Sequence, residues 1–279
     1  GKVKIRFASW DNAEDLDKQQ ALVDQFNASH DDIEVSLEAY GSEYDTKISA
    51  GMGSGDTPDV LYMWDYPSYY EGLEPLDSYI EKEGADYKDN YYDALWPYNS
   101  KGDSVYGIPV GFTTHALFYN KDIFDELQLE YPGQMTWEEY AQLAVKINGT
   151  DPDDVRWGGY LPIWVPNLGA LELGEYLYDD ELPATMDFLT LMDRLYNKDH
   201  SHPNPTEMEE IYAPGYDTFL DGKIGMMING DWTIQILQNL EAFRTENCRW
   251  DAAPLPLTNG AEAGTSIGSN SYLAVYSQS

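Results

Sequence analysis

Two pairs of an aromatic and an acidic residue, Trp10-Asp11 and Trp64-Asp65, stand where the sequence predicts that β-strands end. The preceding segments, 3–9 and 60–64, carry apolar residues in strand-like patterns. Open α/β sheets bind their ligands at the carboxyl ends of parallel strands. An indole covers the apolar face of a sugar ring and a carboxylate accepts hydrogen bonds from its hydroxyl groups, so the pairs suit a neutral polyhydroxylated ligand.

The same two carboxylates allow a hydrolytic alternative. Glycoside hydrolases act through two carboxylates that flank the scissile bond, and Asp11 with Asp65 is the candidate pair here. The chain holds 50 acidic residues, so the choice of any two has little specificity. A hydrolase would release product and raise the pKa of one carboxyl group, whereas a binding protein would return its ligand unchanged.

Other motifs indicate neither a metal nor a cofactor. His200 and His202 precede Pro203 in a predicted loop without a third ligand, which favours a solvated turn over a metal site. The glycines at 51, 53 and 55 follow a helix and precede a strand, the reverse of a dinucleotide-binding motif. Cys248 is the single cysteine, and we expect it to be a partly buried apolar residue. His115 stands out by its position beside Thr114.

Composition narrows the class of protein. The 279 residues include 16 Lys and Arg against 50 Asp and Glu, a net charge of −34, while 42% are hydrophobic. The chain is therefore globular and long enough for two domains. Its charge disfavours nucleic acid and anionic membrane surfaces, whose binding requires Lys and Arg. No apolar run reaches about 18 residues, so the sequence predicts neither a signal peptide nor a spanning helix.

The predicted elements alternate between strand and helix, which indicates an α/β fold with a mostly parallel sheet. Thr136 and Glu139 have the spacing of a capping box and predict the start of a helix that runs to Ile147. The other expected helices are 16–26, 44–52, 166–178, 184–197, 212–220 and 232–240, and the expected strands are 3–9, 33–39, 60–64, 105–110, 116–120, 224–228 and 265–279.

Five motifs occur in a fixed order along nearly the whole chain: Pro58-Asp59-Val60, VYGIP at 105–109, ALFYNKD at 116–122, MTWEE at 135–139 and GKIGMMINGDW at 222–232. Together they resemble the carbohydrate-binding proteins of bacterial ABC importers, the family that includes maltose-binding protein. The resemblance implies a two-lobed periplasmic-binding-protein-like fold. Each lobe would be a mostly parallel sheet flanked by helices, closing on a sugar in the cleft between them. It implies no enzymatic activity and no cofactor.

The resemblance also implies domain limits. The first lobe would comprise residues 1–110 and 265–279, and the second residues 111–264. Family members continue past the returning strand with helices that complete both lobes, and we expect those helices to be absent from this sequence.

Carried over by position, the resemblance predicts ligand contacts in three segments of the chain. They are Trp10, Asp11, Tyr44, Trp64 and Asp65 in the first lobe, Thr114, Trp164, Tyr212 and Trp232 in the second, and Gly268, Ser269 and Asn270 in the returning stretch. None of these residues is Lys or Arg, so we expect neutral sugars to bind and sugar phosphates or uronates to be repelled.

The partners implied are a neutral mono- or oligosaccharide and the permease subunits of an ABC importer, with no nucleic acid. We expect a monomer at the extracellular face of the cytoplasmic membrane, held by a lipid anchor, or in the periplasm. A receptor domain that senses sugar without passing it to an importer remains an alternative.

Overall fold

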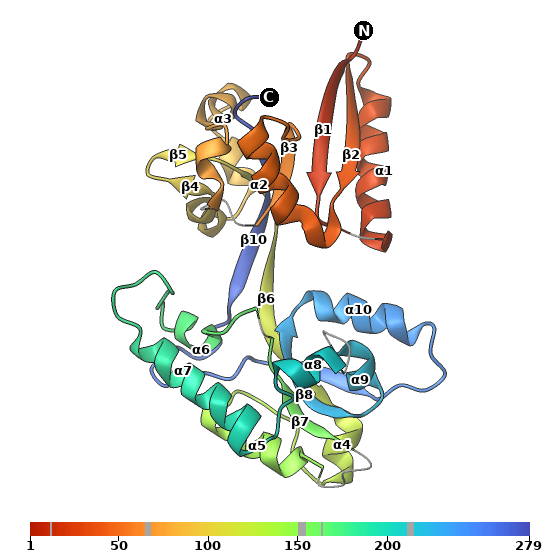
Figure 1. The fold of residues 1–279 in the computed structure, drawn as a ribbon, viewed down its shortest axis with the longest axis vertical. Coiled ribbons are helices and arrows are strands. Elements are labelled where there is room, and N and C mark those ends of the chain that lie inside the picture. The colour runs from red at the N-terminus through yellow and green to blue at the C-terminus, as the bar shows by residue number, and fades with distance from the viewer. Residues whose placement is uncertain (12, 65–67, 150–154, 163, 211–214) are drawn as a thin grey trace. The chain divides into compact units, whose positions relative to one another are not determined.

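The computed structural model describes residues 1–11, 13–64, 68–149, 155–162, 164–210 and 215–279 (Figure 1). The chain forms two compact units, Gly1–Phe112 with Ser269–Ser279, and Thr113–Gly268. These limits differ by a few residues from the predicted lobe boundaries at 110 and 265. Strands β6 (Ile108–Asn120) and β10 (Gly268–Val275) each carry the chain from one unit to the other.

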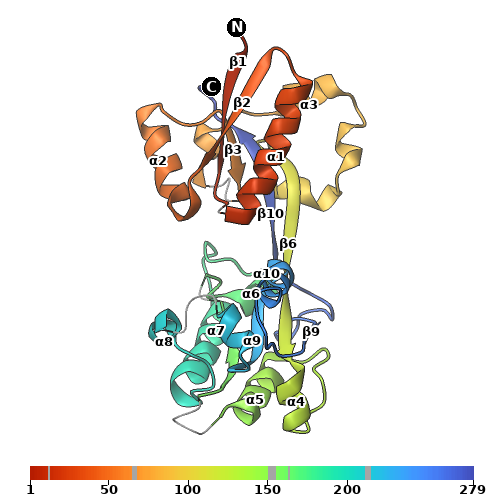
Figure 2. The same ribbon diagram turned by 90° about the vertical axis from the view of Figure 1, so that its right-hand side faces the viewer.

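The first unit opens with the predicted β-α-β arrangement. Its sheet has the order β2-β1-β3-β10, in which β1 is parallel to both of its neighbours and β10 is antiparallel to β3. Helix α1 runs along β1 and β2 (Figure 2). The elements are β1 (Val3–Ser9), α1 (Ala13–Ser29), β2 (Ile33–Ala39), α2 (Tyr44–Ser54), β3 (Val60–Met63), α3 (Asp77–Glu83), β4 (Ser100–Lys101) and β5 (Ser104–Val105).

The alternation of side chains along β3 builds the core of this unit. Leu61 and Met63 are buried together with Ile48 of α2 and Tyr272 of β10. Tyr272 packs so closely on Gly107 that a Cβ atom there would lie 2.2 Å from its ring. Only glycine leaves room for this contact.

The second unit has a mixed sheet. Strand β7 is parallel to β8, whereas β6 is antiparallel to both β8 and β9. The expectation of a mostly parallel sheet in each lobe therefore fits the first unit better than the second. The strands are β7 (Trp157–Tyr160), β8 (Ile224–Gly230) and β9 (Trp250–Ala253), and the helices are α4 (Lys121–Glu126), α5 (Trp137–Ile147), α6 (Leu168–Leu171), α7 (Pro183–Asp193), α8 (Pro205–Glu210), α9 (Tyr216–Leu220) and α10 (Trp232–Glu241).

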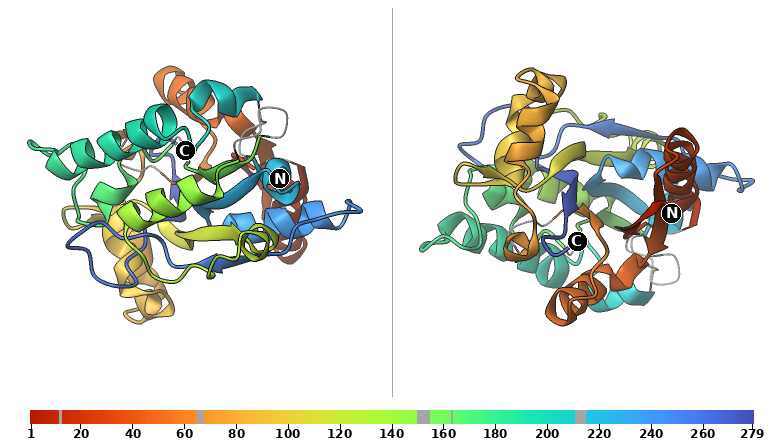
Figure 3. Two further views of the ribbon diagram at one scale, coloured as in Figure 1. Left: turned by 90° about the horizontal axis from the view of Figure 1, so that it is seen from below. Right: turned by 90° about the horizontal axis from the view of Figure 1, so that it is seen from above.

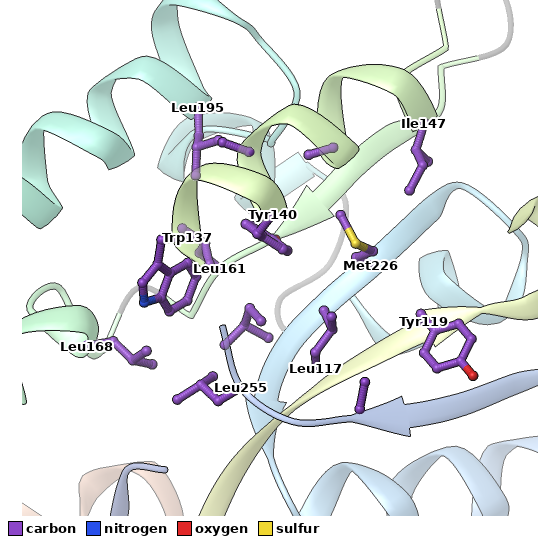
Figure 4. Close-up of a cluster of buried hydrophobic side chains, with 14 of the residues drawn as sticks. Leu117, Tyr119, Trp137, Tyr140, Ile147, Leu161, Leu168, Leu195, Met226 and Leu255 are labelled. Atoms are coloured by element: carbon purple, nitrogen blue, oxygen red, sulfur yellow. The ribbon is translucent and has the colours of Figure 1, made fainter. Parts of the chain in front are cut away.

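Helices cover both faces of this second sheet (Figure 3). Leu117 and Met226 point to the face covered by α5, where Trp137, Tyr140 and Ile147 meet them (Figure 4). The alternate strand residues Phe118 and Met227 point to the opposite face and pack with residues of α9 and α10. Two apolar clusters therefore sandwich the strands.

Several local predictions are confirmed. Helix α5 begins with the capping box, in which the Thr136 hydroxyl accepts from the Glu139 amide at 3.2 Å and the Thr136 amide donates to the Glu139 carboxylate at 2.7 Å. The strand at 33–39 has the predicted limits. Cys248 is half-buried, and its thiol donates to the carbonyl oxygen of Phe219 at 3.4 Å.

Other predictions are wrong in detail. The two strands expected at 105–110 and 116–120 are one strand over 108–120, because β6 also lies beside β10 in the sheet, while its pairing with β8 covers only residues 115–119. The helix expected at 166–178 is the single turn Leu168–Leu171.

Of the helix expected at 212–220, residues 216–220 form α9, and residues 212–214 lie outside the described part of the chain. None of the described helices is both long and apolar enough to cross a bilayer.

Candidate functional site

Aromatic rings gather where β1 and β3 end in the first unit. Trp10 follows β1 and stacks on Tyr62 of β3 with ring centroids 4.0 Å apart and planes at 10°. It also meets Tyr44 edge to face at 5.6 Å. Tyr44 is buried in the core, so it supports Trp10 from behind.

Trp64 is the most exposed predicted aromatic of the first unit. It follows β3 directly, and 54% of its surface is exposed. An indole so exposed offers a face for a ligand, unlike Trp10, one of whose faces is covered by Tyr62. Asp65 lies outside the described residues.

Hydrogen bonds to residues of the first unit fix the position of Asp11. Its backbone amide donates to the hydroxyl of Ser9 at 3.0 Å, and its carboxylate accepts a short hydrogen bond from the Gln19 side-chain amide of α1. Because these contacts fix the carboxylate at the end of β1, it is preorganised to accept hydrogen bonds from hydroxyl groups.

A second aromatic surface forms in the second unit. Trp164 and Trp232 lie with ring centroids 6.5 Å apart at 40°, and 48% of the Trp164 surface is exposed. The ring of His115 meets Trp232 edge to face at 5.6 Å. Burial lowers the pKa of His115, so this ring stays neutral around pH 7. Tyr212 lies outside the described residues.

Thr114 joins β6 to the returning stretch. Its hydroxyl donates to the Ser266 hydroxyl at 2.7 Å, and that hydroxyl donates to the His115 carbonyl oxygen at 2.6 Å. The Nδ1 atom of His115 lies 2.9 Å from the carbonyl oxygen of Ile267. Thr114 therefore lies beside Ser266 of the returning stretch within this unit.

The predicted ligand contacts of the returning stretch, residues 268–270, differ in how far they are buried. Gly268 and Ser269 are exposed, and a Cβ atom at Gly268 would lie 2.3 Å from the carbonyl oxygen of Thr113. Asn270 is buried in the first unit, where its amide donates to the Leu95 carbonyl oxygen at 3.0 Å and to Asn99 at 2.8 Å. We assign the Asn270 side chain to packing and leave it out of the proposed site.

The prediction of a solvated turn is wrong for His202. This side chain is fully buried, with Nε2 2.7 Å from the Tyr140 hydroxyl and Nδ1 3.0 Å from the Ser201 hydroxyl. His200 is exposed and lies 2.9 Å from the Glu207 carboxylate. Across the described part of the chain, no three His, Cys, Asp or Glu side chains converge on a possible metal position.

The sequence analysis did not identify Tyr62, which stacks on Trp10, or Tyr216, which contacts Trp232. Tyr62 alternates with the buried Leu61 and Met63, so strand periodicity already placed it on the face opposite those residues. The hydroxyl of Tyr216 accepts a hydrogen bond from Trp232 Nε1 at 3.1 Å. No sequence signal identified that pair, because it depends on how α9 packs beside α10.

Comparisons with known proteins agree with this architecture. A family model described as bacterial extracellular solute-binding protein matches residues 10–279. The maltotriose-binding protein of Pyrococcus abyssi is 25% identical over 256 residues, covering 84% of this chain and 50% of the relative. The galactooligosaccharide-binding protein of Bacillus subtilis is 25% identical over 283 residues, covering 94% of this chain and 63% of the relative.

Solved structures show the same fold. An ABC substrate-binding protein of Listeria monocytogenes, in complex with cycloalternan, superposes with a TM-score of 0.84 at 22% identity, covering 100% of this chain and 72% of that chain. The two-lobed α/β fold and the family resemblance predicted from the motifs are confirmed. The chain spans between half and two thirds of the two curated relatives' length.

Proposed function

The chain belongs to the bacterial extracellular solute-binding proteins, and from that premise we propose that it binds a neutral mono- or oligosaccharide. The observation that carries this proposal is the pairing of Trp164 and Trp232 beside the neutral ring of His115. Two indoles at this spacing offer an apolar face of the size that pyranose rings stack on. Thr114, the residue before His115, adds a hydroxyl group that can hydrogen-bond to a sugar.

The charges support a neutral ligand. Among the described residues that form the two aromatic surfaces there is no Lys or Arg, and burial keeps His115 uncharged. The anchored carboxylate of Asp11 would repel an anion and accept hydrogen bonds from sugar hydroxyl groups. A phosphate or uronate would therefore meet no compensating positive charge on these surfaces.

We propose binding without catalysis. The matched family and the relatives named above are binding proteins, and they give the hydrolase hypothesis for Asp11 and Asp65 no support. The sugar should therefore be recovered intact after binding.

We further propose that the protein delivers its sugar to the permease subunits of an ABC importer and acts as a monomer. It would do so outside the cytoplasmic membrane, on a lipid anchor or in the periplasm, as the extracellular family description suggests. The interlobe clamp implied by the sequence resemblance stays a prediction. Such a clamp predicts that each chain binds one sugar and that substitutions in the aromatic surface of either unit lower the affinity for it.

Calorimetric titration with neutral oligosaccharides of different linkage and length tests the proposal. We expect saturable binding of at least one sugar, and analysis of the recovered ligand should show no cleavage. Trp64→Ala and Trp232→Ala should each weaken binding by about tenfold or more, since stacking adds about 0.5–1.5 kcal/mol per pair beyond the buried area.

Phe243→Ala and Tyr92→Ala are matched controls, because both side chains are exposed aromatics outside the two surfaces. They should leave the affinity unchanged. Tight binding of a sugar phosphate while every neutral sugar stays inert would refute the proposed ligand class. Cleaved sugar in the recovered ligand would refute binding without catalysis.

A further inference from the structure

The indole of Trp232 is fixed on several sides by residues of its own unit. Its Nε1–H group donates to the hydroxyl of Tyr216 at 3.1 Å. The His115 ring meets it edge to face at 5.6 Å. At Gly230, a Cβ atom would lie 2.0 Å from the indole, so glycine is needed for the ring to occupy this position.

The hydroxyl of Tyr216 is itself held in place. Only 8% of the Tyr216 surface is exposed, and the hydroxyl also accepts from Asn229 Nδ2 at 3.2 Å. Asn229 is fully buried, and its Oδ1 accepts from the backbone amide of Gly230 at 2.9 Å. One hydrogen-bonded chain thus links the end of β8 and helix α9 to the indole at the start of α10.

These contacts reduce the conformational entropy that the indole loses when a ligand stacks on it. An indole without a partner for its Nε1–H group would turn toward water and sample several rotamers. A ligand that stacks on it would then bear the entropy of ordering it, whereas an indole already fixed binds without that loss.

We propose that Tyr216 is a positioning residue for sugar binding, which holds the Trp232 indole in its stacking orientation before the sugar arrives. The inference rests on the proposed function, because it assigns the contact with the sugar to Trp232. It adds that affinity depends on a hydroxyl group behind the indole. Tyr216 acts through Trp232 and not through a contact of its own with the ligand.

Tyr216→Phe removes the hydroxyl and keeps the buried ring. We expect the affinity for the neutral sugar identified by calorimetry to fall about three- to tenfold. Tyr196→Phe is the matched control, since Tyr196 is buried in the same unit to a similar degree and its hydroxyl has no hydrogen-bond partner among the residues that the structure describes. That variant should bind sugar like the parent protein.

A double-mutant cycle shows whether the effect passes through the indole. In a Trp232→Ala background, Tyr216→Phe should cause no further loss of affinity. An equal loss with and without Trp232 would overturn the proposal. Gly230→Ala, which displaces the indole and leaves Tyr216 in place, should also weaken binding.

A measurement without ligand separates this inference from the proposed function. With fluorotryptophan incorporated, the fluorine NMR resonance of Trp232 is assigned by its loss in Trp232→Phe. Tyr216→Phe should shift or broaden that resonance, and Tyr196→Phe should not. An unchanged Trp232 resonance in Tyr216→Phe would overturn the positioning role even if no sugar binds.

Discussion

Acid should destabilise this protein through His202, a buried histidine whose pKa is lowered to about 3 by burial. None of its surface is exposed, and its two ring nitrogens contact the hydroxyls of Tyr140 and Ser201. An ordinary histidine has a pKa of about 6.5. The folded protein therefore keeps this ring neutral at a pH where the unfolded chain protonates it.

The sign and size of the change in unfolding free energy with pH follow from that difference in pKa. The stabilising contribution is fully present above the unfolded pKa of about 6.5 and is lost as the pH falls toward the folded pKa of about 3. Each pH unit in this window changes the free energy of unfolding by about 1.4 kcal/mol. Between about pH 6.5 and 4.5, His202 alone should remove about 2–3 kcal/mol, a large share of a typical domain's stability.

Urea unfolding at a series of pH values measures this effect. We expect the stability of the parent protein to fall more steeply with acid than that of His202→Gln. The comparison isolates His202 from His115, whose pKa burial also lowers. Equal slopes for the parent and His202→Gln would contradict this role of His202, as would an NMR titration of His202 with a midpoint near 6.5.

Four further substitutions test local features by chemical denaturation. Gly51→Ala should destabilise by about 1–3 kcal/mol because the added Cβ would lie 2.8 Å from the Asp56 carbonyl oxygen. Gly53 is exposed in the same helix, and a Cβ atom there would meet no described atom within 4 Å, so Gly53→Ala should stabilise by about 0.5–1 kcal/mol. Equal effects at the two sites would contradict the packing. Thr136→Ala should cost about 1 kcal/mol through loss of the α5 cap, and a neutral result would refute the capping role. Asn270→Ala should lower the unfolding free energy by about 1–3 kcal/mol and leave sugar affinity unchanged, whereas the reverse pattern would restore Asn270 to the ligand site.

Elements whose signals are local could be predicted from the sequence. Apolar alternation located the strand at 33–39, and the Thr136 and Glu139 pair located the start of α5. These features depend on residues within a few positions of each other, so the chain records them directly. Motif order along nearly the whole chain also sufficed for the family and the two-lobed fold.

Which polar and aromatic groups meet depends on tertiary packing. His202 lies in what reads as a polar turn, yet the packing of α5 buries it against Tyr140. The strands predicted at 105–110 and 116–120 are one continuous strand because β10 and β8, both distant in sequence, are its neighbours in the sheet. Tyr216 reaches Trp232 across 16 residues of sequence because α9 and α10 pack together. Contacts of this kind are set by how elements pack, and local sequence does not encode that packing.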